Sequence, residues 1–186
     1  APRTVPMQPE EVDTTPDQPV SFGYKMSWLA IRASDPQQVI DSLAVDNPYL
    51  CNWRTGIPAA YNGHTFVTPS VDGWVFVVSQ DLPDPGHEPD AAGWAALLQT
   101  LSRHFGEAQY FGTHRVVGYH AWAYFRNGIE ERAFVYLGES GEVLVNRGSP
   151  TQGELQLGYK YCDQDPSDTI SDGDPDDHEL CYPDEE

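Results

Sequence analysis

Basic residues are scarce in this chain of 186 residues. Ten Lys and Arg stand against 29 Asp and Glu, so the formal net charge at pH 7 is −19. A surface with so few cations repels the phosphate backbone of nucleic acids and anionic lipid headgroups. The charge balance therefore argues against nucleic-acid binding and membrane-surface binding, and it favours a basic protein or a cation as the partner.

Long apolar runs are also missing. No stretch approaches the roughly 20 apolar residues that a membrane-spanning helix requires, so no membrane span is expected. The chain starts at Ala1 rather than at Met, as it would after removal of a signal peptide. We therefore expect a periplasmic or secreted protein, with the cytoplasm as the alternative.

The common catalytic motifs are absent as well. The sequence contains no HExxH motif, no GxSxG nucleophile elbow, no glycine-rich phosphate loop and no Cys-x-x-Cys pair. We therefore assign no catalytic residue and expect a protein that is not an enzyme. An enzyme of unrecognised type that uses His114 or His120 with Glu107 and Arg115 is an alternative.

The acidic residues are concentrated at the two ends of the chain. Residues 163–186 contain eleven acids and no Lys or Arg, whereas residues 21–162 contain fourteen acids and nine bases. Residues 1–21 are rich in Pro, Thr and acids and have no hydrophobic period, which is typical of disorder. We expect a disordered acidic leader over 1–21, one domain over 22–161 and an acidic appendage over 162–186.

Hydrophobic periodicity predicts two helices within the domain. Asp35-Pro36 is a helix start, with a capping side chain followed by Pro in the first turn. The second helix begins at Asp90, and its apolar residues recur at helical spacing before a stop at Gly106. That apolar face consists of Trp94, Leu97, Leu98, Leu101 and Phe105.

Strands are expected over residues 24–33, 64–68, 74–79, 108–111, 115–126, 129–137 and 142–146. Residues 46–63 are expected to form a loop, and residues 147–161 to be irregular or to end in a short strand. Asn127-Gly128 predicts a two-residue hairpin turn that places Trp122 opposite Ala133. The resulting order predicts an α+β fold: a largely antiparallel sheet with two helices packed on one face.

Aromatic residues crowd the last strands. Both faces of 115–126 are apolar or aromatic, which is typical of a central strand covered on both sides. The alternative is that some of these side chains form an exposed patch for a protein partner, since aromatic residues are enriched in interfaces. The candidates are Tyr119, Trp122, Tyr124 and Tyr136.

Two cysteines, Cys162 and Cys181, bracket the acidic appendage, while Cys51 lies among apolar residues. A Cys162–Cys181 disulfide with a free Cys51 fits an oxidising compartment, and three free thiols in the cytosol are the alternative. A closed loop would present Asp172, Asp174 and Asp176 to a basic partner at a reduced entropic cost.

An EF-hand calcium site needs oxygen donors at defined positions of its loop, and the acidic residues between Cys162 and Cys181 can be aligned with these positions. Counting from Asp168, the third position is Ile170, which has no donor, so a regular EF-hand is not expected. A calcium site of another kind remains open, as does a solvated loop without a ligand. The possible calcium ligands are Asp168, Asp172, Asp174, Asp176 and Glu179.

Four stretches resemble a family of uncharacterised bacterial α+β proteins: MSWLAIRASDPQQVIDSL, CNWRTGIPAAY, FVTPSVDGWVFVVSQDLP and FGEAQYFGTHRVVGYHAWAYF with the strands that follow. The family's motifs are VTPxxDGW and QYFxTHRVxxYHAWA, and the resemblance covers nearly all of residues 22–158. It implies no catalytic residue. Small families of this type include immunity proteins encoded beside toxins. Relatives end in a tail with Trp-Ser-x-Asp-Pro, where this chain has its acidic segment.

These observations lead to three hypotheses. The first is a non-enzymatic binding protein, an immunity protein that neutralises a cognate bacterial toxin with a basic surface. The second is an exported calcium-binding module that uses residues 163–179, and the third is the enzyme of unrecognised type. No cofactor other than calcium is expected.

Overall fold

The computed structural model describes residues 12–87 and 90–157. In these residues the chain forms seven strands and four α-helices, and every strand pair is antiparallel. The strands are β1 (Met26–Ile31), β2 (Phe66–Val67), β3 (Val75–Ser79), β4 (Glu107–His114), β5 (Tyr119–Arg126), β6 (Ile129–Leu137) and β7 (Glu142–Arg147). The helices are α1 (Pro36–Leu43), α2 (Trp53–Ala60), α3 (Asp90–Phe105) and α4 (Gln152–Leu157).

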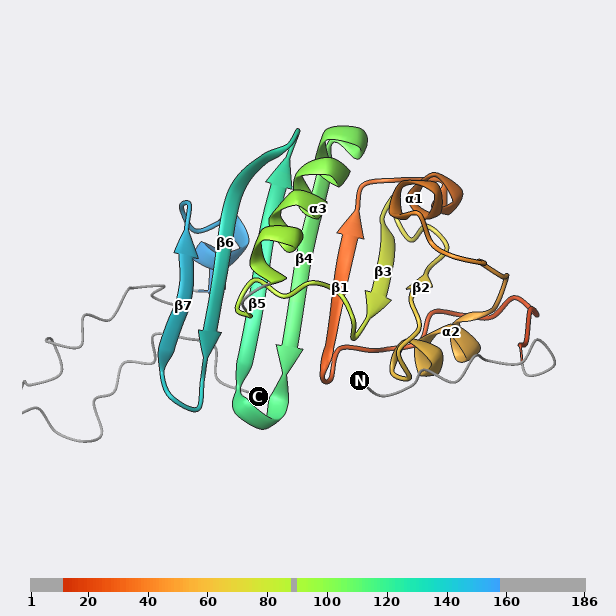
Figure 1. The fold of residues 1–186 in the computed structure, drawn as a ribbon, viewed down its shortest axis with the longest axis horizontal. Coiled ribbons are helices and arrows are strands. Elements are labelled where there is room, and N and C mark those ends of the chain that lie inside the picture. Colours follow the sequence, from red (N-terminus) through yellow and green to blue (C-terminus); the bar gives the residue numbers. More distant parts are fainter. Residues whose placement is uncertain (1–11, 88–89, 158–186) are drawn as a thin grey trace, which may run out of the picture.

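All strands join one sheet in the order β2-β3-β1-β4-β5-β6-β7. Helix α3 lies across β4 and β5 in the view of Figure 1, and α4 lies behind β6 and β7. The α+β architecture with a largely antiparallel sheet is therefore confirmed, and β2 and β7 are the edge strands.

Alternation along the strands divides the buried residues between the two faces of the sheet. Val77 of β3 packs in a core with α1 and α3, while the next residue, Val78, packs against α2 on the other face. Helix α3 buries Trp94, Leu98 and Leu101, which belong to the face that its periodicity predicted. Helices α1 and α3 thus share one face, and α2 adds a cover on the opposite face.

Helix α2 lies within residues 46–63, which the sequence predicted to be irregular. Gly56 and Pro58 lower the intrinsic helix propensity of this segment. The helix forms because its N-terminus is capped and because it buries Trp53 and Ile57 against the sheet. The prediction of a loop was wrong because tertiary contacts outweigh local propensity here. Helix α4, within residues 147–161, was also missed.

The predicted strand 115–126 is shorter in the structure. β4 continues to His114, residues Arg115–Val117 form a 3₁₀ turn, and Gly118 adopts a left-handed conformation with φ of 59°. Only then does β5 begin, so β4 and β5 form a hairpin. Val116 and Val117 are apolar like the residues of the strand that follows, so periodicity alone could not show that they belong to the turn.

The predicted turn at Asn127-Gly128 is present, with positive φ at both residues, as a type I′ turn requires. Trp122 nevertheless pairs with Phe134 and not with Ala133. The register shifts because a β-bulge inserts Glu131 as an extra residue in β6. The predicted register was therefore wrong by one residue beyond the bulge.

Residues 12–21 are the described part of the predicted leader. They contain no helix or strand, in keeping with their lack of hydrophobic period. They do contact the domain: the backbone N–H of Asn52 donates to the carbonyl of Asp13 at 2.9 Å. The described fold therefore extends to the N-terminal side of Phe22, where the domain was expected to begin.

Candidate functional site

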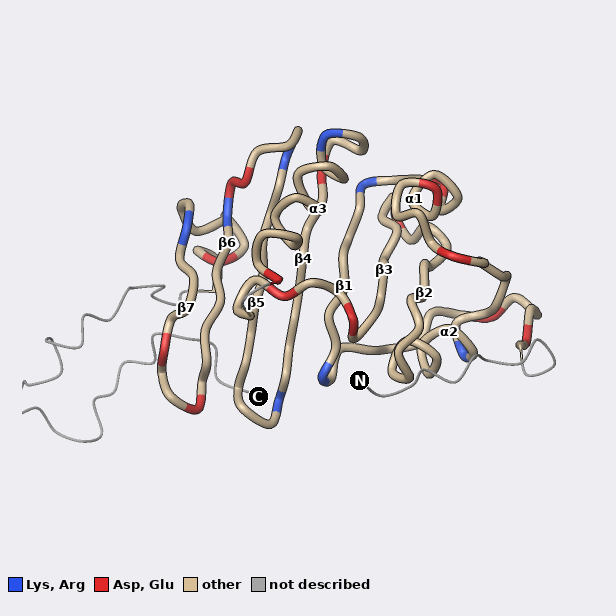
Figure 2. Tube along the Cα trace, in the orientation of Figure 1, with Lys and Arg blue, Asp and Glu red and all other residues tan. Residues whose placement is uncertain are grey.

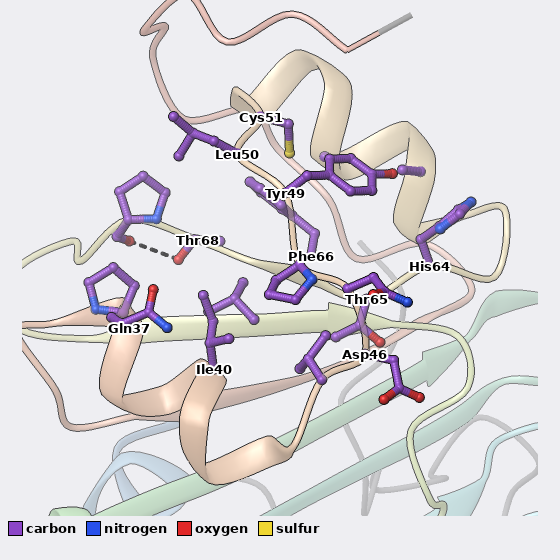
Figure 3. A pocket seen from close by; sticks show the side chains of 18 of the residues that line it. Gln37, Ile40, Asp46, Tyr49, Leu50, Cys51, His64, Thr65, Phe66 and Thr68 are labelled. Atoms are coloured by element: carbon purple, nitrogen blue, oxygen red, sulfur yellow. Dashed lines mark hydrogen bonds between the residues drawn. The ribbon is translucent and has the colours of Figure 1, made fainter. Parts of the chain in front are cut away.

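A cavity of about 490 Å³ lies at the β2 edge of the sheet, between α1 and α2. Its walls are the start of α1 (residues 35–40), the loop 45–51, one side of α2 and the segment 63–69 that contains β2. Figure 3 shows that α1 and α2 flank β2 from two sides, with the loop side chains above it. We call this site the α1–α2 groove.

The first wall is held by the cap of α1. The Asp35 carboxylate accepts a hydrogen bond from the backbone N–H of Gln37 at 2.9 Å, and Pro36 occupies the first turn. The helix ends at Ala44, which has a φ of 49°. This left-handed residue turns the chain away from the helix axis and directs residues 45–51 over the groove.

The second wall, α2, is capped twice. The Asn52 side chain accepts from the backbone N–H of Thr55 at 3.0 Å. The Asp17 carboxylate accepts from the backbone N–H groups of Trp53 and Arg54, each at 2.9 Å. A carboxylate at a helix N-terminus satisfies free donors and interacts favourably with the helix dipole. Residues 12–17 thus position α2 from a distance of more than thirty residues along the chain.

The floor is formed by close contact between α2 and β2. A Cβ atom on Gly56 would lie 2.2 Å from the ring of Phe66, so no larger residue fits there without displacement. The rings of Trp53 and Phe66 meet edge to face with centroids 5.5 Å apart. This packing fixes the distance between α2 and the edge strand, and with it the width of the groove.

The rim of the groove is apolar and exposed. The Leu50 side chain is 78% exposed and that of Tyr49 is 50% exposed. Asp35 and Asp46 also line the groove, and Figure 2 shows acidic segments on α1 and on the loop that follows it. The groove therefore combines apolar surface with negative charge.

Cys51 is half-buried in the groove as a free thiol. Burial raises its pKa, and the nearby Asp17 carboxylate raises it further. In Figure 3 the imidazole of His64 points away from this thiol. Because only the thiolate is a good nucleophile, the surroundings of Cys51 disfavour nucleophilic chemistry at neutral pH.

The four aromatic residues considered for a partner patch do not share one surface. Tyr119 lies on the α3 side of the sheet, and its hydroxyl donates to the Asp84 carboxylate. Burial and this hydrogen bond raise the pKa of Tyr119. Trp122 and Tyr124 are half-buried on the other side, and Tyr136 beside them is only 2% exposed.

The structure brings together only part of the residue set of the enzyme hypothesis, which is His114, His120, Glu107 and Arg115. Six residues apart on one extended strand, His114 and His120 would lie roughly 20 Å from each other. They lie instead on neighbouring strands, since Thr113 pairs with His120 across the β4–β5 hairpin. Glu107 is at the opposite end of β4, seven residues from His114, and its carboxylate lies 3.4 Å from the Arg126 guanidinium. The structure does not bring Glu107 together with the histidines.

The predictions for the acidic appendage concern residues outside the described part of the chain. These are the disulfide Cys162–Cys181, the partner residues Asp172, Asp174 and Asp176, and the calcium ligands Asp168, Asp172, Asp174, Asp176 and Glu179. They stay predictions. Within residues 12–87 and 90–157, no group of three His, Cys, Asp or Glu is placed to hold a metal ion.

The α1–α2 groove was not predicted from the sequence. One signal was available, because the apolar pair Tyr49-Leu50 follows Asn47-Pro48 in a segment without helical or strand period. Apolar residues in such a loop need either a core or a partner to cover them. The sequence could not show that α2 and β2 place these residues beside a cavity.

Among the described helices, none is long and apolar enough to cross a membrane. Comparison with known proteins adds no assignment, since no protein-family model, no curated protein and no solved structure matches this chain.

Proposed function

We propose that this chain is a non-enzymatic binding protein, an immunity protein that neutralises a cognate bacterial toxin, and that the α1–α2 groove contacts the toxin. The observation that carries the proposal is the pairing of a preformed cavity with two exposed apolar side chains, Tyr49 and Leu50, on its rim. Interfaces concentrate binding energy in such apolar and aromatic anchors beside pockets.

The chemistry of the groove defines the kind of segment that would bind. Ile40, Phe66 and Val67 supply apolar lining for an apolar side chain, while Asp35 and Asp46 favour neighbouring Lys or Arg. The net charge of −19 would accelerate encounter with a basic toxin through electrostatic steering. The toxin segment that fits is therefore an apolar residue flanked by bases.

The position of the groove at a sheet edge adds a second mode of contact. β2 is an edge strand of two residues, and the next strand position beyond it is not filled by any described strand. Extended segments of a partner bind such edges through backbone hydrogen bonds, with side chains entering adjacent pockets. We therefore expect the toxin segment to bind in an extended conformation along 63–69.

The test is co-expression with the product of an adjacent toxin gene, followed by affinity measurement. Leu50→Asp places a charge on the rim and should weaken binding about 30-fold, the equivalent of a 2 kcal/mol anchor. Leu155→Asp is the matched control, because Leu155 is 65% exposed on α4, away from the groove. It should bind as the unmodified chain does.

Two negative results would have different consequences. If the chain neither binds the adjacent gene product nor relieves its toxicity, the immunity function is dropped. If the complex forms but Leu50→Asp binds with unchanged affinity, the immunity function stands and the groove is not its contact surface.

A further inference from the structure

A second hollow, of about 650 Å³, lies at the end of the sheet where β1 begins and where β4 turns into β5. Lys25 precedes β1 and Arg115 belongs to the β4–β5 connection, and both side chains are exposed. Figure 2 shows Lys and Arg colouring at these two loops. We call the hollow the basic patch; it is lined by Tyr24, Lys25, Tyr61, Gln80, Arg115 and Val116.

Contacts between these residues hold the patch in shape. The Arg115 guanidinium lies 5.3 Å from the centre of the Tyr24 ring. The Gln80 amide donates to the carbonyl of Lys25 at 3.1 Å, and the Tyr61 hydroxyl accepts from the backbone N–H of Gly23 at 3.3 Å. Segments from four parts of the chain are thereby joined around the two cations.

The charges of the patch are not neutralised by the described part of the chain. The ion pairs within residues 12–87 and 90–157 involve Arg126, Arg132 and Arg147, and none involves Lys25 or Arg115. A guanidinium and an ammonium that line one hollow can both bind carboxylates, and the guanidinium can do so with two parallel hydrogen bonds. The ligand class that fits is an acidic peptide.

The chain itself supplies such a peptide. After Lys160 it contains eleven acids and no further Lys or Arg, and this segment is tethered to the end of α4 at Leu157. The fourteen residues from 158 to 171, which reach the middle of the loop that a Cys162–Cys181 disulfide would close, can span up to roughly 45 Å, whereas a domain of this size is about 40 Å across. A tether of that length holds the acids at an effective concentration in the millimolar range.

We propose that the acidic segment 163–186 binds intramolecularly to the basic patch through its carboxylates. The binding places the most acidic part of the chain against Lys25 and Arg115, at the end of the sheet where β1 starts. It does not depend on the proposed immunity function, because it involves no partner protein.

Carbodiimide crosslinking of the full chain tests the proposal. The reagent activates a carboxylate, and a lysine amine within contact distance then attacks it to form an amide bond. The sequence contains two lysines, Lys25 and Lys160, so a crosslink from Lys25 to residues 163–186 is assigned without ambiguity by mass spectrometry. We expect this crosslink within single molecules, with a yield that falls as sodium chloride is raised to 0.5 M or so, because salt screens exposed charges.

Variants and isotope labelling complete the test. Arg115→Gln should reduce the Lys25 crosslink about two- to five-fold, as expected for loss of one exposed charge contact. Arg103→Gln removes an exposed arginine beside the Asn127-Gly128 turn and should leave the yield unchanged. The proposal is overturned if acetylation shows Lys25 to be accessible and yet no crosslink to 163–186 forms. It is equally overturned if mixed ¹⁴N and ¹⁵N chains show that the crosslinks join different molecules.

Discussion

Removal of Glu154 should be among the most destabilising single changes in this protein. The Arg132 guanidinium on β6 is 1% exposed, and the Glu154 carboxylate on α4 is 6% exposed. Arg132 Nε donates to the two carboxylate oxygens of Glu154 at 3.0 and 3.3 Å. A second guanidinium nitrogen, Nη1, donates to the Asn146 amide oxygen at 2.7 Å and to the carbonyl of Arg147 at 3.1 Å.

The loss in the free energy of unfolding follows from the contacts of Arg132 and of α4 that Glu154→Ala removes. The neutral acceptors around Arg132 remain, but the buried guanidinium loses its ion pair with the Glu154 carboxylate, and removing one partner of a buried pair typically costs about 3–5 kcal/mol. Glu154 also accepts from the backbone N–H of Thr151 at 2.6 Å, so one of the two hydrogen bonds of the α4 capping box is lost as well. Since roughly 2–4 °C of melting temperature accompany each kcal/mol in a domain of this size, a fall of about 6–20 °C is expected.

Urea unfolding followed by tryptophan fluorescence measures the change, with an unchanged slope confirming that the native state stays compact. Glu130→Ala is the matched control. Its carboxylate oxygen lies only 2.7 Å from Nε of Arg147, but the Arg147 side chain is 53% exposed. An exposed pair contributes about 0–1 kcal/mol. Equal losses in the free energy of unfolding for Glu154→Ala and Glu130→Ala would refute the reasoning, because the expected difference arises from burial of the ion pair and not from its contact distance.

Three further outcomes are expected. Gly56→Ala should lower the free energy of unfolding by about 1–3 kcal/mol, because the new methyl group overlaps the Phe66 ring; an unchanged melting temperature would contradict this packing. The pKa of Tyr119 is raised above its ordinary value of 10.0, so stability should be intact below about pH 10 and decline as the pH rises further, by up to about 1.4 kcal/mol per pH unit. Tyr119→Phe should flatten that decline in urea titrations, and an equally steep decline would show that other groups cause it. Asp17→Asn should shift the pH profile of Cys51 alkylation to lower pH, since the Asp17 charge contributes to the raised pKa; a profile shifted upward would be inconsistent with that contribution.

The features that the sequence predicted correctly depend on neighbours along the chain. The α1 cap needs only Asp35 and the two residues after it, and the turn at Asn127-Gly128 needs two residues that tolerate positive φ. The apolar stripe of α3 repeats within one helix, so its period is visible without knowledge of the sheet. Helix α4 has a local signal too, the capping box from Thr151 to Glu154.

The features that the sequence did not predict depend on distant residues. Helix α2 needs Asp17 at its N-terminus and Phe66 below Gly56, and neither is near it in sequence. The shifted register of β6 needs a bulge at Glu131 that periodicity cannot reveal. The α1–α2 groove is still harder to predict from the sequence, since it exists only where α1, α2 and β2 meet.

The sequence alone determined the charge of this protein, its two main helices and its α+β class, because composition and period are properties of the chain itself. Tertiary structure decided which charges are neutralised and which are exposed. Arg132 and Arg115 are the same residue type, yet one is buried against Glu154 and the other lies open in the basic patch. The physical reason is that desolvation and ion pairing depend on what the fold places within a few ångströms of each guanidinium.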